Sequence, residues 1–93
     1  MQSLKELINN PSTKIIDVRS PMEFQIQHIP GAVNIPLDTI ASRIAELKNL
    51  NTNIVVYCQS GGRSSMAKSI LAQAGMDNVF NGGGLYDMQI NLN

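Results

Sequence analysis

Residues 53–65 read Asn53-Ile54-Val55-Val56-Tyr57-Cys58-Gln59-Ser60-Gly61-Gly62-Arg63-Ser64-Ser65, and this stretch decides the fold. Its first part is rich in Val and Ile and predicts a buried strand. The two glycines that follow mark a short turn, and a helical pattern begins after them. Cys58, the only cysteine of the chain, lies where the strand passes into the turn. The stretch therefore predicts a strand–turn–helix unit with a thiol at its bend.

The position of Cys58 favours chemical reactivity over a role as core filler. Backbone N–H groups of a glycine-rich turn and of a helix N-terminus form a cradle that attracts negative charge. A thiolate in that cradle is stabilised, so we expect the pKa of Cys58 to fall below its ordinary value of about 8.5. A lone free cysteine is otherwise usually a small buried hydrophobe. The Gly61-Gly62 turn, with Arg63 after it, favours the reactive alternative because it lets an anion approach the backbone closely.

The rest of the chain predicts strands that alternate with helices. Strands are expected at residues 14–18, 32–35, 54–57 and 78–80, and helices at residues 3–9, 21–27, 37–47, 66–74 and 85–91. Ser3 with Glu6, and Ser20 with Glu23, have the spacing of a capping box. Asp38 is expected to cap the third helix.

This alternation predicts an α/β fold, a small parallel β-sheet flanked by helices on both faces. In such sheets, ligands bind outside the carboxyl ends of the strands. Cys58 lies at the carboxyl end of its strand, so the fold and the local chemistry indicate the same site.

Composition narrows the possible classes of protein. The 93 residues are expected to form one domain, residues 1–93, and 43% of them are hydrophobic. The formal net charge is zero and no basic cluster is present, which argues against nucleic-acid binding. One cysteine and one histidine allow neither an internal disulfide nor a structural zinc site. No leader sequence or membrane-spanning run is apparent, so the expected location is cytoplasmic.

The motifs along the chain, taken together, resemble those of a known family. They are Asp17-Val18-Arg19, Glu23-Phe24, His28-Ile29-Pro30-Gly31-Ala32, Asn34-Ile35-Pro36, Tyr57-Cys58 with Gly61 and Arg63-Ser64, and a glycine cluster at 82–84. In this order and spacing they look like a single-domain rhodanese, and the resemblance covers nearly the whole chain. It implies the rhodanese-like α/β fold and the activity of a thiosulfate sulfurtransferase.

The resemblance also implies that sulfur is carried on the loop cysteine. An enzyme of this family moves a sulfane sulfur from thiosulfate or a persulfide donor to cyanide or a thiol acceptor. Cys58 would hold the sulfur as a persulfide between the two half-reactions. No cofactor and no metal are expected. The expected partners are small sulfur compounds and a protein that donates or accepts a persulfide, but neither nucleic acid nor a membrane. The expected oligomeric state is a monomer or a weak dimer.

Six residues form the predicted substrate- and persulfide-binding loop: Gln59, Ser60, Gly61, Gly62, Arg63 and Ser64. Arg63 has two alternatives, since a guanidinium can bind the substrate anion or pair with an acid and brace the loop. Ser60 and Ser64 can donate to the anion, although we favour a helix-cap role for Ser64. Gln59 is expected to point outward, and the glycines serve backbone geometry.

The family landmarks outside the loop are interpreted mainly as scaffold. Asp17 and Arg19 flank the end of the first strand as supporting residues, and a structural ion pair is favoured over acid–base catalysis. Glu23 is explained by its helix cap, and His28 is expected to be structural. Met88 stands where many family members carry a tryptophan, which changes local packing. The glycines at 82–84 are interpreted as a turn near the loop.

Two other functions remain as alternatives. One is a non-catalytic rhodanese-like module for protein interaction, although such modules often lack the cysteine. The other is a small phosphatase or oxyanion reductase on the same fold. In the related phosphatases, the loop between Cys and Arg is one residue longer than Gln59 to Gly62 here. The shorter loop favours a sulfur-sized anion over a tetrahedral phosphate.

Overall fold

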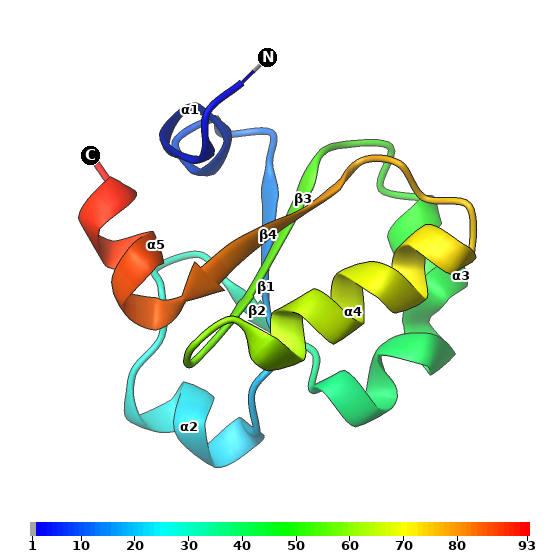
Figure 1. Cartoon of the computed structure of the whole chain (residues 1–93), viewed down its shortest axis with the longest axis horizontal. Helices are drawn as coiled ribbons and strands as arrows, with labels where there is room; N and C mark the ends of the chain where they lie inside the picture. Colours follow the sequence, from blue (N-terminus) through cyan, green and yellow to red (C-terminus); the bar gives the residue numbers. More distant parts are fainter. Residues whose placement is uncertain (1) are drawn as a thin grey trace.

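The computed structural model describes residues 2–93 and has a parallel sheet at its centre (Figure 1). Its strands are β1 (Lys14–Asp17), β2 (Val33–Asn34), β3 (Ile54–Cys58) and β4 (Val79–Gly84), in the spatial order β2-β1-β3-β4. All three neighbouring pairs are parallel, and β3 lies between β1 and β4. The predicted parallel α/β fold is confirmed, and Cys58 ends the most enclosed strand.

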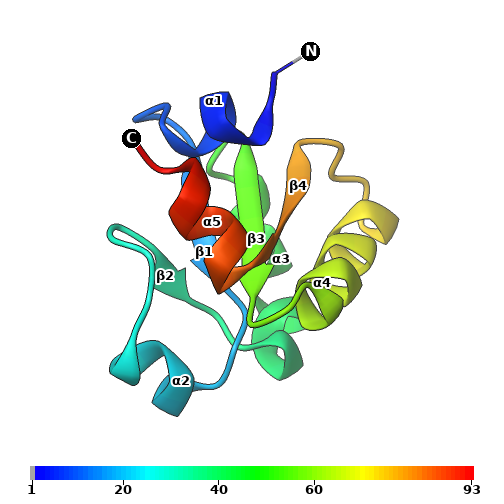
Figure 2. The same cartoon turned by 60° about the vertical axis from the view of Figure 1, so that its left-hand side comes forward.

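Helices cover both faces of this sheet (Figures 1 and 2). They are α1 (Leu4–Ile8), α2 (Pro21–Ile26), the 3-10 helix η1 (Leu37–Arg43), α3 (Ile44–Lys48), α4 (Gly62–Gln73) and α5 (Leu85–Asn91). η1, α3 and α4 lie on one face, whereas α1 and α5 lie on the other. α2 lies beyond the carboxyl ends of the strands, near the loop that follows Cys58.

The side chains of β3 divide between two hydrophobic cores. Ile54, Val56 and Cys58 belong to the core under η1, α3 and α4. Val55 and Tyr57 belong to the core under α1 and α5. Successive strand residues point to opposite faces of a sheet, which explains this alternation. Cys58 is therefore held between the sheet and α4 by a strand that is buried throughout.

Both predicted capping boxes are present. Ser3 and Glu6 exchange hydrogen bonds at the start of α1. At the start of α2, the Glu23 backbone N–H donates to Ser20 Oγ at 3.3 Å, and Glu23 Oε1 accepts from the Ser20 backbone N–H at 3.1 Å. Such reciprocal bonds satisfy N–H groups that have no partner within the helix. They fix where the chain enters α2 directly after β1.

The helix predicted over residues 37–47 is instead η1 followed by the short α3, and the prediction of Asp38 as its cap is wrong. The residue before η1 is Pro36, and no side chain caps this end. The Thr39 hydroxyl donates to the Pro36 carbonyl and the Ser42 hydroxyl donates to the Thr39 carbonyl, each three residues back. Bonds of this spacing compete with the α-helical pattern and match the tighter 3-10 turn.

The glycines at 82–84 are part of strand β4, so their interpretation as a turn is wrong. β4 runs on to Gly84, which lies opposite Cys58, and its register shifts between Val56 and Cys58. An ideal Cβ on Gly84 would lie 2.4 Å from the Gln59 carbonyl oxygen. Glycine in a strand permits this close approach of two backbones. The end of β4 thereby forms one wall of the loop after Cys58.

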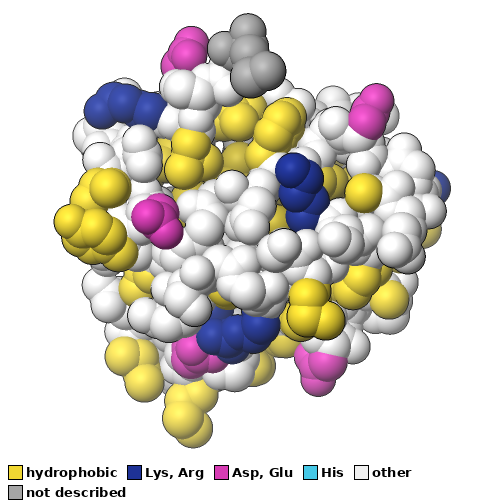
Figure 3. All heavy atoms as spheres, viewed as in Figure 1, with side chains coloured by type: hydrophobic (Ala, Val, Ile, Leu, Met, Phe, Trp, Pro, Cys, Tyr) yellow, Lys and Arg dark blue, Asp and Glu magenta, His cyan; other side chains and the backbone are white. Residues whose placement is uncertain are grey.

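Charged side chains are few and scattered on the face shown in Figure 3, as expected for a chain with 15% charged residues. Hydrophobic side chains protrude where α2 lies, and Met22 and Ile26 of that helix are 72% and 80% exposed. Within residues 2–93, every helix is too short or too polar to cross a lipid bilayer.

Candidate active site

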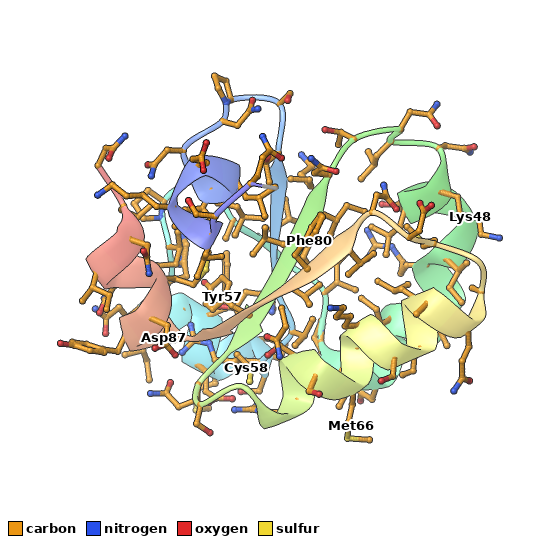
Figure 4. All side chains as sticks on the ribbon, turned by 45° about the horizontal axis from the view of Figure 1, so that its top comes forward. Lys48, Tyr57, Cys58, Met66, Phe80 and Asp87 are labelled. Atoms are coloured by element: carbon orange, nitrogen blue, oxygen red, sulfur yellow. The ribbon has the colours of Figure 1, made fainter. Side chains whose placement is uncertain are left out.

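The loop after β3 wraps its backbone around the sulfur of Cys58 (Figure 4). The Gly61 N–H donates to Cys58 Sγ at 3.0 Å, and the Ser64 N–H donates to the same atom at 3.4 Å. Gly61 has φ +102°, in the left-handed region that favours glycine, and this turn points its N–H at the sulfur. The cradle of N–H groups that the sequence predicted is therefore present around the thiol.

The loop lowers the pKa of Cys58 despite the burial of its side chain. Cys58 is only 1% exposed, and this burial favours the neutral thiol and raises its pKa. Hydrogen bonds to sulfur from the Ser64 hydroxyl and N–H, and from the N–H groups of Ser60 and Gly61, oppose that effect and outweigh it. The net direction agrees with the prediction from the sequence, and it increases the fraction of nucleophilic thiolate near neutral pH.

Ser64 is not a helix cap, which corrects the role favoured from the sequence. α4 begins at Gly62 with Gly61 as its N-cap, so Ser64 lies inside the first turn. Its side chain is fully buried, with Oγ 3.4 Å from Cys58 Sγ. The positive φ of Gly61 starts the helix earlier than the serine pair suggests. Ser64 is thus brought to the thiol by tertiary geometry that local sequence rules do not describe.

Asn81, on β4, is a site residue that sequence reasoning missed. Its amide oxygen lies 2.7 Å from Ser64 Oγ and accepts the Gly83 N–H at 2.8 Å. A signal was available, because a polar side chain near the carboxyl end of a strand beside β3 points to the same edge as Cys58. That strand was predicted to stop at residue 80, which removed Asn81 from consideration.

Arg63 pairs with Glu23 across the gap between α4 and α2. Its two terminal nitrogens donate to the two carboxylate oxygens at 2.7 and 3.0 Å. Because Glu23 also forms the cap of α2, one carboxylate joins the capping box to the first turn of α4. Of the two roles considered for Arg63, this geometry corresponds to pairing with an acid that braces the loop. Binding of the substrate anion by Arg63 stays a prediction.

The Glu23–Arg63 pair makes stability depend on pH in the acid range. The hydrogen bond from Arg63 is the largest cause that lowers the pKa of Glu23 from 4.5 to about 2; hydrogen bonds from Ser20 add to it, and burial opposes it. A depressed folded-state pKa adds stability that is present above the unfolded pKa and is lost as pH falls toward the folded pKa. We therefore expect wild type to be more stable than Glu23→Gln at pH 7, with the difference shrinking between pH 4.5 and 2.

Urea unfolding of both proteins across that pH range measures this effect. Glu23 is 34% exposed, so solvent screening keeps the difference small. A difference that stays constant from pH 7 to pH 3 would contradict a role for the Glu23 charge.

Asp17 and Arg19 form a buried ion pair at the end of β1. The carboxylate accepts Arg19 Nη2 at 2.8 Å and Nε at 3.0 Å, and the two side chains are 0% and 3% exposed. Arg19 Nη1 also donates to Gln59 Oε1 at 3.1 Å. Gln59 is exposed as predicted, yet its amide is held by Arg19. The pair favoured from the sequence is present, and it anchors the first residue after Cys58.

A family model described as Rhodanese-like domain matches residues 1–88. The chain belongs to the rhodanese-like domain family. The resemblance stated from the sequence is therefore confirmed, and the cysteine, the loop and the glycine cluster that carried it all meet at one edge of the sheet.

Individual members of the rhodanese-like family match most of the chain. The thiosulfate sulfurtransferase PspE of Escherichia coli K12 is 45% identical over 74 residues, which are 78% of this chain and 71% of that protein. A solved structure described as rhodanese with anions from E. coli is 42% identical, with a TM-score of 0.74 over 81% of this chain and 89% of that chain. The human single-domain sulfurtransferase TSTD1 is 27% identical, with a TM-score of 0.78 over 94% and 88%. Other curated relatives are longer, and the chain spans 44% of one and 24% of another.

Two remaining landmarks of this rhodanese-like domain are held by packing. Met88 is fully buried, and a Cβ added to Gly82 would lie only 2.5 Å from its sulfur. His28 stacks on Phe24 with ring centroids 3.7 Å apart, and its Nδ1 lies 2.7 Å from the Phe24 carbonyl oxygen. Among residues 2–93, no group of three His, Cys, Asp or Glu side chains could hold a metal ion.

A hollow of about 350 Å³ lies beside the loop, between the end of β1 and the start of α4. Its lining residues are Val18, Arg19, Ser20, Pro36, Leu37, Asp38 and Arg63. Arg63 belongs both to the lining of this hollow and to the loop after Cys58.

Proposed function

We propose that this protein is a sulfurtransferase that carries a sulfane sulfur on Cys58 as a persulfide. The observation that supports this most strongly is the convergence of the Gly61 and Ser64 N–H groups on Sγ, at 3.0 and 3.4 Å. Preorganised N–H donors and a helix N-terminus stabilise negative charge as it develops. The predicted sulfurtransferase class is confirmed by the sulfurtransferases among the relatives.

The reaction consists of two displacements at sulfur. In the first, the Cys58 thiolate attacks the outer sulfur of the donor. A new S–S bond forms, the donor's own bond to that sulfur breaks, and thiosulfate would release sulfite with the bonding electron pair. In the second, cyanide or a thiolate attacks the terminal sulfur, and Cys58 leaves as a thiolate. The loop N–H groups stabilise the anion at the start and at the end of this cycle.

The charges around the loop favour a persulfide donor over thiosulfate. Residues 59–62 contain no cation, and the Arg63 guanidinium is already paired with Glu23. A thiosulfate dianion would find little compensating charge there, whereas a persulfide presents less charge. We therefore propose that a protein persulfide is the preferred donor and thiosulfate a slower one. The cytoplasmic location, the monomeric or weakly dimeric state and the absence of nucleic-acid or membrane partners stay predictions.

Intact mass after incubation with a donor tests the persulfide directly. Reduced wild type and Cys58→Ser are treated with thiosulfate, and in parallel with a small-molecule persulfide, and excess reagent is removed. We expect a gain of one sulfur atom on wild type alone, and cyanide should remove it as thiocyanate. The gain should be faster with the persulfide, because the loop lacks free cations.

The serine variant separates this reaction from the binding-module alternative. Cys58→Ser keeps a similar shape but lacks the nucleophile, so a module that only binds partners would be unaffected. An equal gain of sulfur on wild type and Cys58→Ser would contradict the proposal. So would no gain with either donor on a folded wild type whose Cys58 can be alkylated.

A further inference from the structure

The hydroxyl of Ser64 lies among more acceptors than it can serve. A serine hydroxyl has one proton to donate. Around Ser64 Oγ lie the Asn81 amide oxygen at 2.7 Å, the Gly61 carbonyl at 3.1 Å, and the Gly83 carbonyl and Cys58 Sγ, both at 3.4 Å. The sulfur therefore has to compete for this proton.

The orientation of the Asn81 amide is fixed by its second partner. The Gly83 N–H lies 2.8 Å from the same amide atom that faces Ser64. A backbone N–H can only donate, so that atom must be the amide oxygen. Two oxygens 2.7 Å apart need a proton between them, and the proton comes from Ser64.

The other carbonyls are weaker competitors than Asn81. The Gly61 carbonyl already accepts the Ser65 N–H of the first helical turn at 3.0 Å, and the Gly83 carbonyl is more distant from Ser64 Oγ. When Cys58 is a thiol, its S–H can donate to Ser64 Oγ while the hydroxyl donates to Asn81. When Cys58 is a thiolate, the hydroxyl has a charged acceptor, and hydrogen bonds to ions are the stronger ones.

We propose that Asn81 is a positioning residue that holds the Ser64 hydroxyl proton while Cys58 is a thiol and yields it to the sulfur when negative charge develops there. The amide thus sets how much Ser64 stabilises the thiolate that attacks the donor and that leaves at the end of the cycle. The role matters for catalysis only if the proposed sulfur transfer takes place. Its effect on the pKa of Cys58 can be measured independently of sulfur transfer.

The charged groups near the loop belong to three contacts, and each group has a partner. Arg63 of α4 pairs with Glu23 of α2, and Asp17 pairs with Arg19 after β1. From α5, Asp87 Oδ2 accepts the Gly84 N–H at 2.8 Å. Substitutions at Asn81 leave these groups in place. They also remove the contact of Asn81 Nδ2 with the Gly61 carbonyl at 3.5 Å, so the Ser64→Ala background is needed to separate an effect through Ser64 from one through the loop backbone.

A double-mutant cycle on the titration of Cys58 tests the proposal. The rate of alkylation by iodoacetamide is measured against pH for wild type, Asn81→Leu, Ser64→Ala and the double variant. Without the amide oxygen, the hydroxyl is free to donate to sulfur, so Asn81→Leu should lower the pKa of Cys58 by roughly half a unit, about the net value of one hydrogen bond. In the Ser64→Ala background, the same substitution should change nothing.

Asn78→Leu is the matched control, since Asn78 directly precedes β4 at the end of the strand away from Cys58. It removes an asparagine side chain that donates to the Thr52 carbonyl, and it should leave the titration of Cys58 unchanged. If Asn81→Leu folds poorly, Asn81→Asp retains the acceptor for Gly83 and Ser64. It should raise the pKa of Cys58, and by more with Ser64 present than in Ser64→Ala.

The two kinds of failure are distinguishable. Alkylation reports on the thiol whether or not sulfur is transferred, so a missing persulfide would leave this test intact. A rise in the Cys58 pKa in Asn81→Leu would overturn the proposal. So would a fall of equal size with and without the Ser64 hydroxyl.

Discussion

Gly84→Ala is expected to abolish most sulfur transfer and to destabilise the fold. A Cβ at this position would lie 2.4 Å from the Gln59 carbonyl oxygen and 3.1 Å from Ser60 Cα. Both are backbone atoms of the loop, so relief of the clash must move the loop itself. Overpacking of this kind costs about 1–3 kcal/mol. The N–H groups of the same loop converge on Cys58, so a shift of the loop displaces them from the sulfur. Displacing catalytic groups by about 1 Å can lower a rate by about a hundredfold, and we expect persulfide formation to be at least roughly tenfold slower.

The matched control for Gly84→Ala is Gly62→Ala. The two glycines belong to the same site, but a Cβ on Gly62 would have no atom within 4 Å. Gly62 begins α4, where alanine is a better helix former by up to about 1 kcal/mol. Urea unfolding and persulfide formation should therefore be near wild type or slightly improved in Gly62→Ala. Equal behaviour of the two variants would contradict the steric role of Gly84.

The features that the sequence predicted correctly depend on residues close together in the chain. The capping boxes of Ser3 and Ser20 need only a partner three residues away. The strand–turn–helix unit around Cys58 follows from an apolar run and two glycines. These rules depend only on the local sequence, so they can be applied before the fold is known.

The features that were missed depend on how distant segments meet. Ser64 reaches the sulfur because Gly61 adopts a left-handed conformation and starts α4 early. Asn81 reaches Ser64 because β4 continues past the point where glycines usually mark a turn. The glycines serve close contact between β4 and the loop, and sequence alone cannot distinguish that use from a turn.

Asp17→Asn is expected to destabilise the fold strongly, although the change is nearly isosteric. It retains the shape of the side chain and an oxygen for the Arg19 N–H, but it removes the charge that faces the Arg19 guanidinium. The two side chains are 0% and 3% exposed, so water cannot replace the lost partner. Breaking a buried ion pair by removing one charge costs about 3–5 kcal/mol, a large share of the roughly 5–15 kcal/mol that stabilises a typical domain.

Glu46→Gln provides the comparison that isolates the effect of burial on the free-energy cost of neutralising an ion pair. Glu46 pairs with Arg43 at 2.7 Å, nearly the same distance as in the buried pair, but the two side chains are 58% and 37% exposed. Neutralising an exposed pair changes stability by about 0–1 kcal/mol. Urea unfolding at pH 7 should therefore separate the two variants by about 2 kcal/mol or more.

The buried pair is also expected to couple stability to catalysis. Arg19 holds Gln59 as well as Asp17, so a guanidinium that has lost its carboxylate can shift the first residue of the loop. In a double variant, Asp17→Asn with Arg19→Met, no unpaired charge is left in the core, and part of the stability should return. Persulfide formation should recover less, because Gln59 would still lack its anchor. If Asp17→Asn were as mild as Glu46→Gln, the ion pair would not be what holds the end of β1 against the loop.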